Sequence, residues 1–346
     1  MIYWMTLVAD WVCSRTPRRP RLWVSGGVGV LVYWLWPAKR HVTVANMAQV
    51  LGQPPNHPEV RAVARRSWRN YARYVSDLFA LPGTTAEETL AHFEDTTPAP
   101  GWEGRFDRAH ASGRGVLIAT AHFGSWDAAA VLLASRAPLN VIAETFPDPR
   151  LNELMVRQRR ALGMEIIPLE RAPRQMLRIL QAGGVVATPV DRPLPAGEGM
   201  AVTYFGRRCY VPGGFAQMAV RTGATILVGF TWHREGYDDT LYGFVSEPIV
   251  PEPSGDRGAD AVALTQRIYD VIEEVVRARP ALWYMFRPFW PAAEDATGKD
   301  ATWSPAADQR TAAAADASPT AVAASAPQGA HVADARTADA EGRADG

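Results

Sequence analysis

An alternation of short apolar runs with longer helical segments, beginning at Gly115, constrains the fold of this 346-residue chain more than any other feature. Continuous apolar runs are typical of buried strands, and apolar residues three or four positions apart are typical of helices. The predicted strands cover 115–120, 139–143, 164–168, 184–190, 201–205, 225–231 and 241–247. The predicted helices cover 126–136, 149–162, 172–182, 213–222 and 259–278. This order predicts an α/β fold with a mainly parallel or mixed central sheet flanked by helices.

Composition divides the chain into three expected parts. Residues 1–40 are apolar and basic, residues 41–290 form the folded domain and include a predicted helix over 58–82, and residues 291–346 are rich in Ala, Asp, Thr, Ser, Pro and Gly. The last part has too few large apolar residues to offset the entropy cost of ordering, so we expect a disordered acidic tail.

The N-terminal part contains two apolar stretches, Met1–Val12 and Leu22–Pro37, separated by a basic run. The second stretch is shorter than the roughly 20 residues that a helix needs to cross a bilayer. Aromatic and basic residues near its ends favour a position at the membrane interface. The alternative is a helical hairpin buried against the folded domain.

The charges are unevenly distributed although the formal net charge is zero. Residues 1–40 carry six basic and one acidic side chain, whereas the chain from Pro291 onward carries nine acidic and four basic ones. The folded part therefore has a positive excess, which favours an anionic membrane surface; we expect no nucleic-acid partner. Cys13, Cys209 and seven scattered histidines show no ligand spacing, so we expect neither a disulfide framework nor a metal site.

The segment His122-Phe123-Gly124-Ser125-Trp126-Asp127 lies between a predicted strand and a predicted helix. His122 is then at the strand exit and Asp127 in the first helical turn, where the chain can fold back and bring the carboxylate to the ring. A histidine oriented in this way is a general base. Gly124 permits a close backbone approach, and Ser125 is a candidate N-cap. The alternative is a His122 that only caps the loop.

Five segments, in the same order, resemble the bacterial lipid A lauroyl/myristoyl acyltransferase family. This family belongs to the lysophospholipid acyltransferase-like superfamily and includes the phosphatidylinositol mannoside acyltransferases. The His122–Asp127 segment is similar to the His-x4-Asp/Glu motif. The other four segments are Asn46–Leu51, Phe146–Asn152 with Arg157–Gly163, Val190–Pro193 with Tyr204–Gly206, and Val211–Ala219 with Thr222–Ala224. The resemblance extends over about residues 35–290.

The resemblance implies a membrane-associated acyltransferase on the cytoplasmic face of the inner membrane. A fatty acyl chain would pass from an acyl-CoA or acyl carrier protein thioester to a hydroxyl of a membrane lipid acceptor, a glycolipid or lysophospholipid. The thioester is a co-substrate, and no cofactor is implied. His122 would be the general base and Asp127 its orienting partner, so neither Ser125 nor Cys209 is needed as a nucleophile.

Negative charge that develops on the thioester oxygen calls for fixed hydrogen-bond donors. The candidates are Arg159, Arg160 and backbone amides near Gly124. The alternatives for the two arginines are a solvated helix face and a phosphate contact. Asp191 and Arg192 follow the strand 184–190 and form either a pair that supports the site or binds the substrate headgroup, or a local ion pair.

Several alternatives stay open at this point. The segment Trp283–Trp290 keeps aromatic residues and one arginine but lacks the histidine and basic cluster of the lipid A branch, so other glycolipids or phospholipids are candidate acceptors. A thioesterase or lipid hydrolase could use the same dyad on water, and a non-catalytic lipid-binding protein could use the same fold. Aromatic residues that either line an acyl channel or pack in the core are Trp68, Trp102, Trp126, Phe146 and Phe215.

Overall fold

The computed structural model describes residues 2–83, 85–233 and 239–290, and in this part of the chain an N-terminal layer of helices precedes the sheet. These helices are α1 (Ile2–Arg15), α2 (Arg18–Leu35), α3 (Pro37–Leu51) and α4 (Pro58–Ala80). The helix predicted over 58–82 is confirmed as α4, which begins with a proline in its first turn, a position where no backbone N–H is needed. The expected tail from residue 291 lies outside the described residues.

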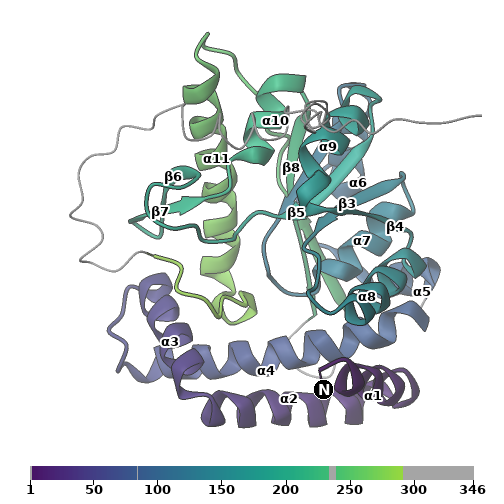
Figure 1. Ribbon diagram of the computed structural model, residues 1–346, viewed down its shortest axis with the longest axis vertical. Helices are drawn as coiled ribbons and strands as arrows, with labels where there is room; N and C mark the ends of the chain where they lie inside the picture. The colour runs from purple at the N-terminus through teal and green to yellow at the C-terminus, as the bar shows by residue number, and fades with distance from the viewer. Residues whose placement is uncertain (1, 84, 234–238, 291–346) are drawn as a thin grey trace, which may run out of the picture. The chain divides into compact units, whose positions relative to one another are not determined.

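Helix α2 packs along α4 on the side away from the sheet (Figure 1). A Cβ atom added to Gly29 would lie 2.4 Å from the carbonyl oxygen of Trp68, so the two helices approach this closely only with glycine at position 29. The other side of α2 is exposed and apolar, with Val24, Leu31 and Leu35 in water. The segment therefore packs one face on the folded domain, as the helical-hairpin alternative expects, and leaves its other face exposed; a position at the membrane interface stays a prediction. Among the described helices, none has the length and hydropathy that crossing a membrane requires.

A seven-stranded sheet forms the centre of the fold, in the order β1-β9-β8-β2-β5-β3-β4. The strands are β1 (Phe93–Asp95), β2 (Val116–Thr120), β3 (Leu139–Ala143), β4 (Met164–Pro168), β5 (Val185–Pro189), β8 (Thr225–His233) and β9 (Leu241–Val245). Neighbouring strands are parallel except for the antiparallel pair β8 and β9. The predicted fold class, a mainly parallel or mixed sheet, is confirmed.

Helices cover both faces of the sheet because alternate residues of the buried strands point to opposite sides. Val116 and Ile118 of β2 pack with α6 and α7, whereas Leu117 and Ala119 belong to the core beneath α9, α10 and α11. The helices that follow α4 are α5 (Ala86–Ala91), α6 (Gly101–His110), α7 (Trp126–Ala134), α8 (Pro149–Ala161), α9 (Ala172–Gln181), α10 (Gly214–Thr222) and α11 (Arg257–Ala278).

A separate antiparallel hairpin holds β6 (Met200–Tyr204) and β7 (Arg207–Val211). The sequence predicted the first of these strands but not that it lies outside the central sheet. Strands β1 and β7 and helices α5 and α6 were not predicted.

The chain after α11 passes over the loop that contains His122. A 3-10 turn at Pro280–Leu282 leads to Trp283, which forms an isolated antiparallel bridge with Phe123. The next backbone N–H, of Tyr284, donates to the carbonyl oxygen of His122 at 2.8 Å. Because Trp283 is fully buried, this C-terminal segment fixes the loop from the side opposite to the strands.

Candidate active site

His122 lies two residues beyond the carboxyl end of β2, and Asp191 lies two residues beyond the carboxyl end of β5. The two strands are parallel neighbours whose register pairs Thr120 with Pro189, and the N–H of Val190 continues the ladder to the Thr120 carbonyl at 2.8 Å. The two strand ends therefore meet at one edge of the sheet, where open α/β sheets hold their sites. His122 Nδ1 is 2.7 Å from Asp191 Oδ1.

The Asp191 carboxylate is completely buried and accepts three kinds of hydrogen bond. The backbone N–H of His122 donates to both oxygens at 3.1 and 3.0 Å, and Trp283 Nε1 donates to Oδ2 at 2.9 Å. A carboxylate only accepts, so the proton of the imidazole is on Nδ1 and Nε2 keeps its lone pair. The His122 side chain is 38% exposed, and within the described residues no side chain or backbone group binds Nε2. This is the geometry of a histidine prepared to accept a proton.

Asp127 does not bind the His122 ring, and the prediction that it orients the histidine is wrong. Its Oδ2 accepts a 2.5 Å hydrogen bond from the Tyr74 hydroxyl of α4, and its Oδ1 accepts a 3.0 Å bond from Arg159 Nε of α8. The first turn of α7 directs the carboxylate toward these two helices, while the neighbouring strand end supplies the carboxylate at Nδ1.

The Asp127 cluster, defined as Asp127, Tyr74 and Arg159, is a buried charge pair with a phenol. Burial, together with the nearby negative charge of Asp127, raises the pKa of Tyr74 well above its usual value, so the hydroxyl stays protonated and donates. The negative charge of Asp127 raises the pKa of Arg159, against the opposite effect of burial. Both partners therefore hold the Asp127 carboxylate in place.

The cluster reaches His122 through aromatic rings rather than through a hydrogen bond. The Tyr74 ring lies 3.9 Å from the Trp126 ring, centroid to centroid, and the Trp126 ring lies edge-on to the His122 ring at 5.5 Å. Asp127 thus positions the Tyr74 ring, which packs on Trp126, and the Trp126 ring in turn packs against the imidazole.

The two candidate arginines of α8 separate in the structure. Arg159 is mostly buried in its ion pair with Asp127, so the alternative of a solvated face does not apply to it. The Arg160 side chain is exposed and forms no hydrogen bond or ion pair within the described residues. A substrate contact by either arginine stays a prediction.

Three backbone amides at Gly124 and its two neighbours already have partners within the protein, so they are not free to donate to the thioester oxygen as expected. Those of Phe123, Gly124 and Ser125 donate to the carbonyls of Ala121, Leu282 and Thr231 at 2.6, 3.0 and 2.8 Å. The close approach that glycine permits is to β8, because a Cβ atom on Gly124 would lie 2.1 Å from the Thr231 carbonyl oxygen and its φ is +58°. Ser125 is at the N-cap position of α7, but its side chain forms no capping bond.

Asp191 and Arg192 have separate partners, so the alternative of a local ion pair between them is wrong, and of the two only Asp191 supports the site. Asp191 points to His122, and Arg192 forms an ion pair with Glu144. Burial, with a smaller effect of the nearby Arg287, lowers the pKa of Arg192. A headgroup contact by Arg192 remains a prediction.

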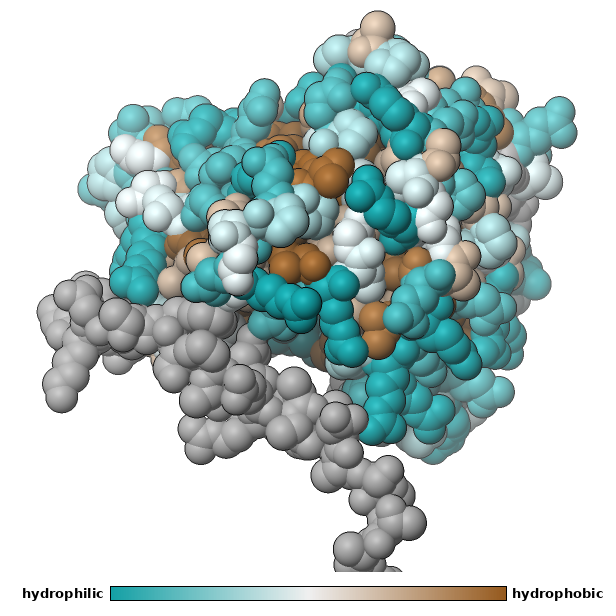
Figure 2. All heavy atoms as spheres, turned by 90° about the horizontal axis from the view of Figure 1, so that it is seen from above, coloured by the Kyte–Doolittle hydropathy of each residue, from teal (hydrophilic) through white to brown (hydrophobic). Residues whose placement is uncertain are grey.

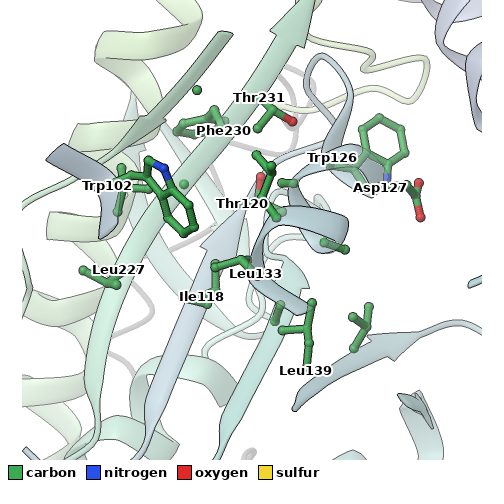
Figure 3. A pocket seen from close by; sticks show the side chains of 18 of the residues that line it. Trp102, Ile118, Thr120, Trp126, Asp127, Leu133, Leu139, Leu227, Phe230 and Thr231 are labelled. Carbon is green, nitrogen blue, oxygen red and sulfur yellow. The ribbon is translucent and has the colours of Figure 1, made fainter. Parts of the chain in front are cut away.

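An apolar cavity of about 70 Å³ adjoins the Asp127 cluster, between the sheet and helices α6 and α7 (Figure 3). Trp126 and Asp127 lie together at one side of it and Trp102 and Leu227 at the other, with Ile118 and Thr120 between. Two of the five aromatic residues considered for an acyl channel, Trp102 and Trp126, therefore line this cavity.

Two residues of the site were absent from the sequence candidates. Trp283 had a signal, because it lies in the aromatic segment noted after the last helix. Tyr74 had none, since it lies 53 residues before Asp127 and nothing in its local sequence connects the two residues. Among the described residues, no group of three His, Cys, Asp or Glu side chains is placed to hold a metal ion.

Comparison with known proteins shows one family over most of the chain. Residues 1–291 match the family described as bacterial lipid A biosynthesis acyltransferase. The phosphatidylinositol mannoside acyltransferase of Mycobacterium tuberculosis is 33% identical over 253 residues, 71% of this chain and 76% of the relative. That of Mycolicibacterium smegmatis is 30% identical over 254 residues, 71% and 78% of the two chains. The crystal structure of the 1-acyl-sn-glycerophosphate acyltransferase of Thermotoga maritima covers 69% of this chain and 94% of its own, with 15% identity and a TM-score of 0.32.

Proposed function

The chain belongs to the bacterial lipid A biosynthesis acyltransferase family, and we propose that it transfers a fatty acyl chain from a thioester to a hydroxyl of a glycolipid at the membrane. The enzyme is an acyltransferase of the lipid A and phosphatidylinositol mannoside type. We propose acyl-CoA or acyl carrier protein as the donor. The names of the mycobacterial relatives favour a phosphatidylinositol mannoside as the acceptor to test first.

The observation that carries the proposed mechanism is the 2.7 Å contact between His122 Nδ1 and the fully buried Asp191. Nε2 takes the proton of the acceptor hydroxyl while the oxygen attacks the thioester carbonyl carbon. The carbon–sulfur bond then breaks, and the imidazolium returns the proton to the leaving thiolate. Asp191 stabilises the imidazolium and keeps the ring in the Nδ1–H tautomer. The acceptor supplies its own nucleophile, so no covalent enzyme intermediate forms.

The cavity beside Trp126 supports an acyl-chain role for this region. Its lining is mostly apolar and includes Trp126, whose ring also packs against the His122 ring. An apolar cavity of this kind favours hydrocarbon over water. We propose that the acyl chain enters between α6, α7 and the sheet, with side chains moving to lengthen the cavity.

The exposed side of α2 supports a membrane location. Trp23 is 69% exposed and Leu35 72% exposed, and a surface of this kind is typical of helices that lie in the bilayer interface. The thioester donors are cytoplasmic, so we place the enzyme on the cytoplasmic face of the inner membrane.

The proposal is tested by acyl transfer from labelled acyl-CoA to purified phosphatidylinositol mannoside. His122→Ala should lower kcat by about 10²–10⁴-fold, the usual contribution of a general base. His92→Ala is the matched control, because His92 is an exposed histidine whose side chain binds nothing in this site. Unchanged transfer by His122→Ala contradicts the mechanism, and thioester cleavage that ignores the acceptor indicates a hydrolase instead.

A further inference from the structure

A cleft of about 720 Å³ lies where α2, α3 and α4 meet, and the residues of the proposed reaction do not line it. Its lining combines two aromatic residues with three arginines and a histidine. We call it the α2–α4 cleft and define it by Tyr33, Trp34, Arg40, His41, Arg61 and Arg65.

Three guanidinium groups converge on this cleft without a counter-charge. Arg61 and Arg65 are one turn apart on α4, and Arg40 is in the first turn of α3. Within the described residues, none of the three forms an ion pair with a carboxylate. Burial raises the pKa of Tyr33, and the positive charges of Arg40, Arg65 and Arg61 oppose that rise, which places all three near its phenol. The cleft therefore holds concentrated positive charge.

The arginine of α3 is held in an orientation that suits a phosphate. Its guanidinium carbon lies 5.8 Å from the centre of the Tyr33 ring and 5.4 Å from the centre of the Trp34 ring. Packing on aromatic rings occupies the guanidinium and orients it at little further entropy cost. Phosphate oxygens are the acceptors that arginine clusters recognise best.

The cleft opens at the edge of the apolar side of α2. Trp34 belongs to both, because it lines the cleft and is 56% exposed, and its neighbours Leu35 and Trp36 are exposed as well. Residues 11–76 contain eleven basic side chains and only one acidic side chain, Glu59. In a phospholipid the acyl chains lie below the phosphate. The exposed apolar side chains of α2 would reach the level of the acyl chains, and the arginines beside them would lie at the level of the phosphates.

We propose that the α2–α4 cleft binds the headgroup phosphate of an anionic phospholipid in the bilayer, and that this lipid is not the acyl acceptor. The proposal rests on the membrane location proposed above. In this arrangement the apolar side of α2 enters the interface, and the cleft selects anionic lipid and fixes the orientation of the enzyme on the surface. The acceptor site at His122 is left free, because its residues are separate from those of the cleft.

The test is binding of the full chain to vesicles of phosphatidylcholine alone and of phosphatidylcholine with phosphatidylinositol. The variant is Arg61→Ala with Arg65→Ala, two exposed residues whose removal leaves the core unchanged. The matched control is Arg171→Ala with Arg178→Ala, which removes the same charge from exposed positions on and next to α9. Both proteins are also assayed for acyl transfer in detergent micelles.

We expect the cleft variant to lose roughly thirtyfold in affinity for the anionic vesicles, since each arginine near such a surface contributes on the order of a factor of five. The control should lose less than about twofold, because exposed charges outside a Debye length are screened. Transfer in detergent should be unchanged in both variants. Equal losses in the two variants, or no loss in the cleft variant, would overturn the cleft while leaving the acyltransferase mechanism intact. A wild-type chain that binds neither vesicle overturns the membrane location and the cleft together.

Discussion

Two carboxylates lie close to His122 in the sequence or in space, and they have different surroundings and different work. Asp191 is at the end of a strand, with three donors of the His122 loop and the C-terminal segment around it. Asp127 is in the first turn of a helix, where it forms an ion pair with Arg159 and accepts a hydrogen bond from the Tyr74 hydroxyl. Asp191 faces the Nδ1 atom of the histidine, whereas Asp127 holds the aromatic residues Tyr74 and Trp126 beside the histidine ring.

The edge of the sheet, and not distance along the chain, determines which carboxylate binds the histidine. Asp191 is 69 residues from His122, but parallel pairing of β2 with β5 brings the two strand ends together. Asp127 is five residues away, and the helix turns it toward α4 and α8. The two regions can be separated by substitutions that affect the rate in one case and the stability in the other.

The largest expected effect comes from Asp191→Asn. All three surrounding groups are donors, so the amide NH₂ faces a donor and the Nδ1–H tautomer loses its support. We expect kcat to fall by about 10⁴-fold, as when the aspartate of a Ser-His-Asp triad becomes asparagine. Steady-state transfer assays and a thermal unfolding scan measure the rate and the fold. If kcat stays within about tenfold of the wild-type value, the role of Asp191 is contradicted.

Arg159→Met should act mainly on stability. The substitution leaves the Asp127 carboxylate buried with only the Tyr74 hydroxyl as a partner, and breaking a buried pair in this way costs about 3–5 kcal/mol. Urea unfolding should show a lower midpoint with an unchanged slope. Arg160→Met is the matched control, since Arg160 is exposed on the same helix and should change the free energy of unfolding by less than about 0.5 kcal/mol. Equal effects of the two substitutions would show that Asp127 does not depend on Arg159.

Gly124→Ala probes the loop that connects the two regions. The backbone has a positive φ at this position, and the added Cβ would contact the Thr231 carbonyl oxygen. We expect a loss of about 1–3 kcal/mol in the free energy of unfolding from backbone strain, with a further loss of rate as His122 shifts. Gly52→Ala is a useful comparison, because Gly52 also has a positive φ but has open space around its Cβ position. The additional cost at position 124 measures how tightly the loop is held against β8.

Tyr74→Phe should give the smallest effect. It removes one hydrogen bond to Asp127 but keeps the ring that packs on Trp126. We expect a loss of about 1–3 kcal/mol at most, near the lower end because Arg159 still pairs with the carboxylate. Chemical unfolding measures the stability, and acyl transfer should fall far less than in Asp191→Asn. A rate loss as large as that of Asp191→Asn would show that Tyr74 takes part in the chemistry.

The sequence predicted the parts of the fold that local patterns determine. The apolar run that became β2 and the helix that became α7 placed His122 at a strand end, and the structure confirms this placement. Strand β7 was missed because its first two residues, Arg207 and Arg208, break the apolar pattern. Helix α6 was missed because its ten residues are mostly polar and include two glycines, Gly101 and Gly104, which disfavour a helix.

The partner of His122 was beyond prediction because it depends on the order of the strands. Asp191 was recognised as a strand-end residue, but nothing in the local sequence shows that β5 lies beside β2 rather than at another place in the sheet. With strand neighbours unknown, the carboxylate nearest in the chain was preferred. Figure 2 shows that the face of the molecule opposite α2 is largely hydrophilic. The position of this face was not predicted either, because exposed polar residues need not follow a regular spacing.

The most direct measurement is the tautomer of His122 from the ¹⁵N chemical shifts of its ring nitrogens, in the wild type and in the Asp191→Asn and Asp127→Asn variants. We expect a proton on Nδ1 in the wild type, a shift of that proton toward Nε2 in Asp191→Asn, and the wild-type tautomer in Asp127→Asn. A tautomer that changes in Asp127→Asn and stays the same in Asp191→Asn would contradict the pairing of His122 with Asp191.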